Sequence, residues 1–113
     1  MLITIDVGNT NITVGVFEGD DIKATFRITT KMPRTSDEYG MLLLNLLEQN
    51  EIAPKEIEDV IIASVVPKVM HSLEAAITKY LHITPINIEP GIKTGIRIAI
   101  DNPKQVGADR IVD

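Results

Sequence analysis

The residues best suited to chemistry lie at the start of the chain, where Asp6-Val7-Gly8-Asn9-Thr10 ends an apolar run. A carboxylate at the end of an apolar strand is costly unless it is paired, hydrogen-bonded or bound to a metal. Gly8 supplies the unusual φ of a tight turn, and Asn9 tolerates it. One interpretation is a phosphate-binding turn, with backbone amides and the Thr10 hydroxyl as donors and Mg²⁺ between Asp6 and the phosphates. The alternative is a plain hairpin in which Asp6 accepts hydrogen bonds from nearby amides.

A second candidate lies near the other end of the chain, in Gly107-Ala108-Asp109-Arg110. In phosphoryl transfer, Asp109 would accept the proton of a substrate hydroxyl and Arg110 would hold an anionic group. The alternative is an ordinary helix start, because an acidic residue in the first turn interacts favourably with the helix dipole. For this segment taken alone, the structural alternative is favoured.

Other chemically active side chains lack partners at a useful spacing. His71 and His82 are eleven positions apart without a further metal ligand nearby, so we expect both to be ordinary surface residues. Ser64 lies in an apolar run without the Gly-x-Ser-x-Gly context of a hydrolase nucleophile, so we expect a buried structural hydroxyl. Lys93 and Arg97 could meet an anionic substrate, although solvation is the usual role of such charges.

Composition narrows the function classes. The chain has 113 residues, enough for one domain with a core, and it is 44% hydrophobic and 24% charged. A net charge of −5 and only 4% aromatic residues argue against nucleic-acid binding and against an anionic membrane surface. The sequence has no cysteine, no signal-peptide pattern and no apolar stretch of about 20 residues that would span a bilayer. These features are compatible with a reducing cytoplasm.

The elements that must position these residues follow from the apolar pattern. Three short strands, over residues 2–7, 11–17 and 22–30, succeed one another too closely for crossover helices and therefore form an antiparallel meander. Thr35-Ser36-Asp37-Glu38 is a capping box, which predicts a helix over residues 36–49. Leucines cover more than one face of this helix, so it is either deeply buried or packed on another subunit, and a core helix is favoured.

The second part of the chain predicts alternating strands and helices. A continuous apolar run predicts a buried parallel strand over residues 60–66, and Pro67 then suits the first turn of a helix over 68–81. Further strands are expected over residues 84–88 and 96–100, with a turn at 101–103. This order predicts an α/β domain whose mixed sheet combines three antiparallel meander strands with parallel strands and flanking helices.

Together, the motifs resemble a known family. Asp6-x-Gly8-Asn9-Thr10 is similar to the first phosphate motif of the acetate and sugar kinase/Hsp70/actin superfamily. The combination of this turn with four further motifs resembles type III pantothenate kinase, from Met1 to Asp113. Those motifs are Ser64-Val-Val-Pro67, Pro90-Gly91-x-x-Thr94-Gly95, Asp101-Asn102-Pro103 and Gly107-Ala-Asp-Arg110.

The resemblance implies a ribonuclease H-like (actin-like ATPase) domain and the phosphorylation of pantothenate by ATP to 4'-phosphopantothenate, the first step of coenzyme A biosynthesis. Asp109 would be the proton acceptor and Arg110 a substrate contact, within a pantothenate-binding turn formed by Gly107, Ala108, Asp109 and Arg110. Asp6 would also lie near Mg²⁺, through water. The ATP phosphates would meet a loop made of Asp6, Val7, Gly8, Asn9, Thr10, Asn11, Ile12 and Thr13.

The resemblance further implies a cytoplasmic homodimer that needs a monovalent cation, potassium or ammonium. The family has two such halves, and the second contains another Asp-x-Gly-Thr turn and the cation ligand, whereas no second Asp-x-Gly occurs here. We therefore expect residues 1–113 to be a single N-terminal domain of a two-domain protein, with little or no kinase activity alone. The alternatives are a kinase of another small substrate and a non-catalytic regulator, which would not need Asp109 beside Arg110.

Overall fold

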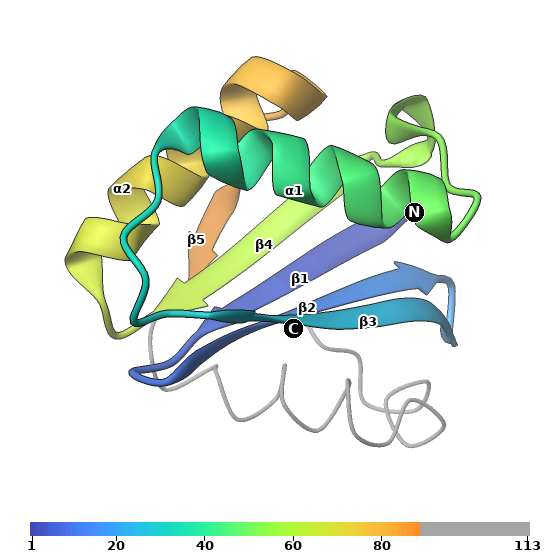
Figure 1. Ribbon diagram of the computed structural model, residues 1–113. Helices are drawn as coiled ribbons and strands as arrows, with labels where there is room; N and C mark the ends of the chain where they lie inside the picture. The colour runs from blue at the N-terminus through green and yellow to red at the C-terminus, as the bar shows by residue number, and fades with distance from the viewer. Residues whose placement is uncertain (89–113) are drawn as a thin grey trace.

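The computed structural model describes residues 1–88 of the chain (Figure 1). Within this range, five strands form one mixed sheet in the order β3-β2-β1-β4-β5. Helices α1 and α2 both lie over the same face of the sheet (Figure 1). The elements follow in the order β1 (Leu2–Val7), β2 (Asn11–Glu18), β3 (Asp21–Thr29), α1 (Ser36–Gln49), η1 (Pro54–Glu56), β4 (Asp59–Ser64), α2 (Pro67–Ala76), η2 (Ile77–Leu81) and β5 (Ile86–Ile88).

The first three strands form the predicted meander. β1 pairs antiparallel with β2, and β2 pairs antiparallel with β3. The turn between β2 and β3 places Gly19 at a φ of +60°, a conformation that glycine adopts without steric cost. Alternation along β3 is also as predicted: Ile28 is buried towards the helices, whereas Arg27 and Thr29 are exposed on the other face.

β1 lies at the centre of the sheet, because its other edge pairs with β4. This second pairing is parallel and runs from Leu2 opposite Asp59 to Val7 opposite Ser64. The carboxyl ends of β1 and β4 therefore meet at the same edge of the sheet. In open α/β sheets, ligands bind outside the carboxyl ends of the strands.

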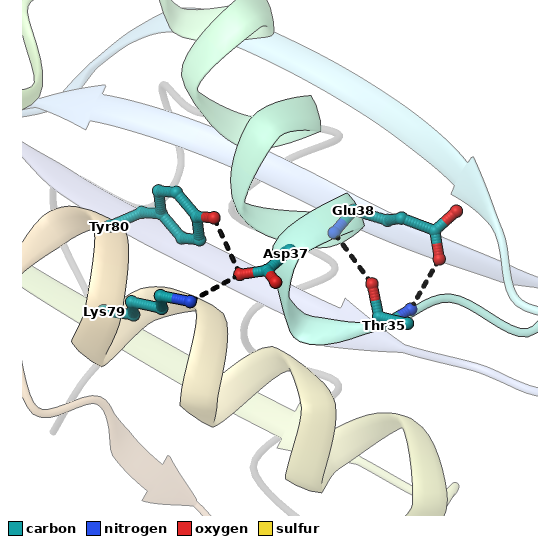
Figure 2. Close-up of polar contacts among 5 residues, drawn as sticks. All are labelled: Thr35, Asp37, Glu38, Lys79 and Tyr80. Atoms are coloured by element: carbon teal, nitrogen blue, oxygen red, sulfur yellow. Dashed lines mark hydrogen bonds and ion pairs between the residues drawn. The ribbon is translucent and has the colours of Figure 1, made fainter.

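The apolar core fills the space between the sheet and the two helices. α1 begins at the predicted capping box: the Glu38 amide donates to Thr35 Oγ1 at 3.1 Å, and the Thr35 amide donates to Glu38 Oε1 at 2.8 Å (Figure 2). This helix is amphipathic rather than buried all round, since Met41 is 60% exposed. The largest fully buried core side chains are Tyr39, Ile3, Ile5, Ile12, Leu43, Leu47, Ile62, Leu73, Ile77, Val7 and Val14.

Three boundaries differ from the sequence prediction. β4 ends at Ser64, two residues before the end of the apolar run, because the Ser64 side chain closes a turn with Val66. α2 begins at Pro67 and changes into a π-helix over Ile77–Leu81, which no local pattern indicates. β5 is confined to Ile86–Ile88. The strand expected over 96–100 and the turn at 101–103 lie outside the described residues.

A polar cluster joins the start of α1 to the π-helical turn η2 (Figure 2). Lys79 Nζ and the Tyr80 hydroxyl both donate to Asp37 Oδ1, each at 2.7 Å. The hydrogen bond from Lys79, followed by that from Tyr80, lowers the pKa of Asp37 below its usual value. The same bonds to Asp37 raise the pKa of Lys79 and of Tyr80. The π-helical turn η2 therefore presents two adjacent hydrogen-bond donors to the Asp37 carboxylate of α1.

Replacing Gly40 with alanine should destabilise the protein by about 1–2 kcal/mol. A Cβ at this buried position of α1 would overlap ring carbons of Tyr80, with Cγ only 2.7 Å away. Overpacking costs about 1–3 kcal/mol, which exceeds the gain of about 1 kcal/mol from the higher helix propensity of alanine. Urea unfolding of the two proteins measures the difference.

A double-mutant cycle with Tyr80→Ala supplies the control. Once the ring is absent, the Gly40→Ala change should stabilise the protein by up to about 1 kcal/mol, because only the helix propensity remains. A change that destabilises equally in both backgrounds would show that Tyr80 is not the reason for glycine at this position.

Candidate functional site

The Gly8–Thr10 turn is held in place by residues of the neighbouring strands. The Gly8 amide donates to the Asn11 carbonyl at 2.9 Å, which closes the turn between β1 and β2. From the end of β3, Thr30 donates its amide to the Thr10 carbonyl at 3.0 Å and its hydroxyl to the Gly8 carbonyl at 2.9 Å. Thr30 thus fixes both ends of the turn.

The backbone of this turn differs from our expectation. Among residues 1–88, positive φ angles occur at Gly19, Glu51 and His82, so neither Gly8 nor Asn9 takes the left-handed conformation. The three hydrogen bonds to and from the turn replace the special backbone geometry that the sequence predicted. The prediction was wrong on this point because it treated the turn as a local feature.

Asp6 lies on the face of the sheet opposite the two described helices. It is 2% exposed, and in the register it lies opposite Thr13 of β2 and Ala63 of β4. Thr4 and Thr13 are buried on the same face, at 0% and 3% exposure. A buried carboxylate at the end of the central strand could bind a hard cation or accept hydrogen bonds.

The residues predicted to contact ATP phosphates form two groups. Val7 and Ile12 point into the apolar core with 0% exposure, so their side chains are not available to a ligand. Asn9, Thr10 and Asn11 are exposed at the turn itself. The polar residues of the set, which include Asp6 and Thr13, therefore all lie at one end of the sheet.

The start of α2 lies beside the same turn. The Val65 amide donates to the Val7 carbonyl at 3.2 Å, which continues the β1–β4 pairing past the end of β4. Ser64 Oγ accepts from the Val66 amide at 2.9 Å and donates to the Val66 carbonyl at 3.1 Å, so its hydroxyl is structural, as predicted, although Ser64 is half-buried. Pro67 then begins the helix. The carboxyl edge of the sheet therefore combines the Gly8–Thr10 turn with a helix N-terminus.

Of the other predicted candidates, the structure describes some, and the rest lie beyond residue 88. His71 and His82 are exposed, and within residues 1–88 there is no group of three or more His, Cys, Asp or Glu residues that would hold a metal ion. No helix in this range is long and apolar enough to cross a membrane. The predicted pantothenate turn and the other later candidates lie outside the described residues: Gly107, Ala108, Asp109, Arg110, Lys93 and Arg97.

Replacing Thr30 with valine tests whether the turn must be held from β3. The Gly8 carbonyl would lose its hydroxyl donor, so the free energy of unfolding should fall by about 1 kcal/mol. If the turn binds ATP, the KM for ATP of the complete gene product should rise by about tenfold, since a displaced loop loses its alignment. Denaturant unfolding and steady-state kinetics measure the two effects. Thr29→Val is the matched control because Thr29 is exposed at the adjacent position.

Comparisons with known proteins identify the family of this chain. A family model described as type III pantothenate kinase matches residues 2–113. The type III pantothenate kinase of Agathobacter rectalis is 67% identical over 113 residues, which are 100% of this chain and 44% of that protein. Those of two Bifidobacterium longum strains are 51% identical over the same length, again 44% of each protein. The chain thus spans less than half the length of these relatives. It belongs to the type III pantothenate kinase family.

Proposed function

We propose that this chain is the N-terminal domain of an enzyme that transfers the γ-phosphoryl group of ATP to pantothenate, giving 4'-phosphopantothenate for coenzyme A biosynthesis. Residues 1–113 would form one ribonuclease H-like domain of a two-domain protein. The family match supports the reaction class. The observation that supports the site best is the buried Asp6 at the end of β1, directly before a turn fixed by Thr30.

The residues at the carboxyl edge fit a nucleoside triphosphate with Mg²⁺. Mg²⁺ is usually bound by one or two carboxylates, waters and substrate phosphates, so the single carboxylate of Asp6 is a suitable protein ligand, through water. When bound, Mg²⁺ would neutralise charge on the phosphates. The exposed Asn9 and Thr10 would donate hydrogen bonds to phosphate oxygens, and the fixed turn would keep those donors in position before ATP arrives.

The roles on the acceptor side of the reaction are those that the family resemblance implies. Asp109 would accept the proton of the pantothenate hydroxyl as its oxygen attacks the γ-phosphorus, and ADP would leave. Arg110 would bind the pantothenate carboxylate or another anionic oxygen. Gly107 and Ala108 would let the backbone approach the substrate. One phosphate turn without an opposing half leaves ATP open to water, which supports low activity for the isolated domain.

Radiolabelled ATP tests the function directly. The complete gene product should transfer label from [γ-³²P]ATP to pantothenate in the presence of Mg²⁺, whereas the 113-residue chain alone should show little or no transfer. Preferential labelling of another small alcohol would favour a kinase of different specificity. ATP binding without any transfer would favour the non-catalytic regulator. Robust turnover by the 113-residue chain would contradict the two-half interpretation.

The remaining expectations come from the resemblance and stay predictions. They are a homodimer, a requirement for potassium or ammonium, and a cytoplasmic location. A groove on the outer side of α1, lined by Met41, Leu42, Leu44 and Asn45 among others, is a candidate surface for a second subunit. Light scattering measures the oligomeric state, and replacing potassium with sodium in the assay tests the cation.

A further inference from the structure

A single peptide group links the end of β3 to the Gly8–Thr10 turn. Its N–H is the amide of Thr30, which donates to the Thr10 carbonyl at 3.0 Å. Its C=O is the carbonyl of Thr29, which accepts a hydrogen bond from Arg34 Nη1 at 2.9 Å. A trans peptide group directs its N–H and its C=O to opposite sides, and no cis peptide bond occurs among the described residues. The peptide group between Thr29 and Thr30 is therefore held from both sides.

The Arg34 side chain is itself anchored to the interior of the protein. Its Cζ lies 5.9 Å from the centroid of the Tyr39 ring, which is within the range of a cation–π contact. Tyr39 belongs to α1, and it is 1% exposed and part of the apolar core. Arg34 is partly buried and lies in the loop that joins β3 to α1. Its guanidinium therefore connects a fixed ring of the core to the peptide group that follows β3.

A charged donor on a peptide carbonyl strengthens the hydrogen bond that the same peptide group donates. Charge-assisted hydrogen bonds are stronger than neutral ones, and successive hydrogen bonds polarise one another. Arginine suits this place because its planar guanidinium can stack on an aromatic ring while it donates a hydrogen bond. The hydroxyl of Thr30 also donates to the Gly8 carbonyl. The orientation of this peptide group therefore sets the place of Thr30 and both of its contacts with the turn.

We propose that Arg34 is a positioning residue for the Gly8–Thr10 turn and acts through the peptide group between Thr29 and Thr30. Its effect on nucleotide binding rests on the proposed function, in which this turn donates hydrogen bonds to the ATP phosphates. In this role Arg34 does not touch ATP. Without its guanidinium the peptide group is free to rotate, Thr30 loses its alignment with the two carbonyls of the turn, and the donors for phosphate oxygens are displaced.

Amide hydrogen exchange of the complete gene product tests the positioning role without any substrate. Mass spectrometry compares the parent protein with Arg34→Gln, Arg34→Lys and Lys31→Gln, on peptides that cover the end of β3, the Gly8–Thr10 turn and β4. We expect Arg34→Gln to speed exchange at the end of β3 and at the turn by about tenfold, with β4 unchanged. Arg34→Lys should lie between, because lysine keeps the charge but not the planar guanidinium. Lys31→Gln is the matched control, since it removes an exposed cation from the same loop, and it should exchange like the parent.

Steady-state kinetics connect the positioning role to the proposed reaction. Arg34→Gln should raise the KM for ATP by about three- to tenfold, with kcat changed by less than about twofold and the KM for pantothenate unchanged. Arg34→Lys should recover part of the loss. Lys31→Gln should change each constant by less than about twofold, because an exposed charge contributes little.

The outcomes separate this proposal from the proposed function. If Arg34→Gln exchanges like the parent, or if β4 exchanges faster to the same extent, Arg34 does not position the turn. The proposal is also wrong if pantothenate is phosphorylated with an unchanged KM for ATP although the turn exchanges faster, or if Lys31→Gln raises that KM equally. If exchange at the turn depends on Arg34 but pantothenate is not phosphorylated, the positioning role is supported and the proposed function fails. If glutamine prevents folding, Arg34→Lys decides, because the proposal requires faster exchange at the turn than in the parent.

Discussion

Replacing Asp6 with asparagine should lower kcat/KM for ATP by at least about 100-fold in the complete gene product. Asparagine has nearly the same shape, but it removes the negative charge that we propose holds Mg²⁺ through water. The Mg²⁺ concentration needed for half-maximal activity should rise as well. Steady-state kinetics over a Mg²⁺ titration measure both effects, and calorimetry with Mg-ATP shows whether binding weakens independently of turnover.

Thr4→Val is the matched control for this substitution. Thr4 points to the same face of β1 and is fully buried, and among residues 1–88 its hydroxyl has no hydrogen-bond partner. Valine should therefore leave the kinetics unchanged, and it should leave the fold as stable as before or more stable, because a buried hydroxyl without a partner is removed. If both variants lose activity equally, the loss at Asp6 reflects packing of this face and not metal binding.

Replacing Asp109 with asparagine should lower kcat by about 10²- to 10⁴-fold while the KM for ATP stays nearly constant. Asparagine cannot accept the proton of the pantothenate hydroxyl, yet it can still hydrogen-bond to the substrate. The slope on the acid side of the kcat profile, which reports titration of the base, should disappear in the variant. Asp113→Asn, in the same segment, is the control and should turn over normally. Normal turnover by Asp109→Asn would show that another group is the base.

The sequence predicted the elements whose signals are local. Alternation gave the meander strands to within one or two residues, and the Thr35–Glu38 capping box gave the start of α1. Local signals did not indicate the π-helical turn, whose side chains contact a residue far away in the sequence. Lys79 and Tyr80 of η2 donate hydrogen bonds to Asp37, which precedes Tyr80 by 43 residues.

The residues of the candidate site were likewise predictable from the sequence only in part. Asp6 was identifiable because an acid at the end of an apolar strand is unusual, and its burial confirms that it belongs to the interior. Thr30 gave no signal, because its position depends on the pairing of β2 with β3. Once a meander is predicted, however, the residue that follows its third strand can be expected beside the first turn, and this reasoning would have found Thr30.

The central position of β1 in the sheet should make it one of the last segments to unfold locally. Its backbone is hydrogen-bonded on both sides, to β2 and to β4, so its amides should be among the last to exchange with deuterated solvent. Asp6 belongs to this segment, whereas β3 and β5, the outermost of the described strands, should exchange sooner. The Gly8–Thr10 turn that follows β1 should therefore be ordered during folding, so binding of a ligand there need not supply that entropy.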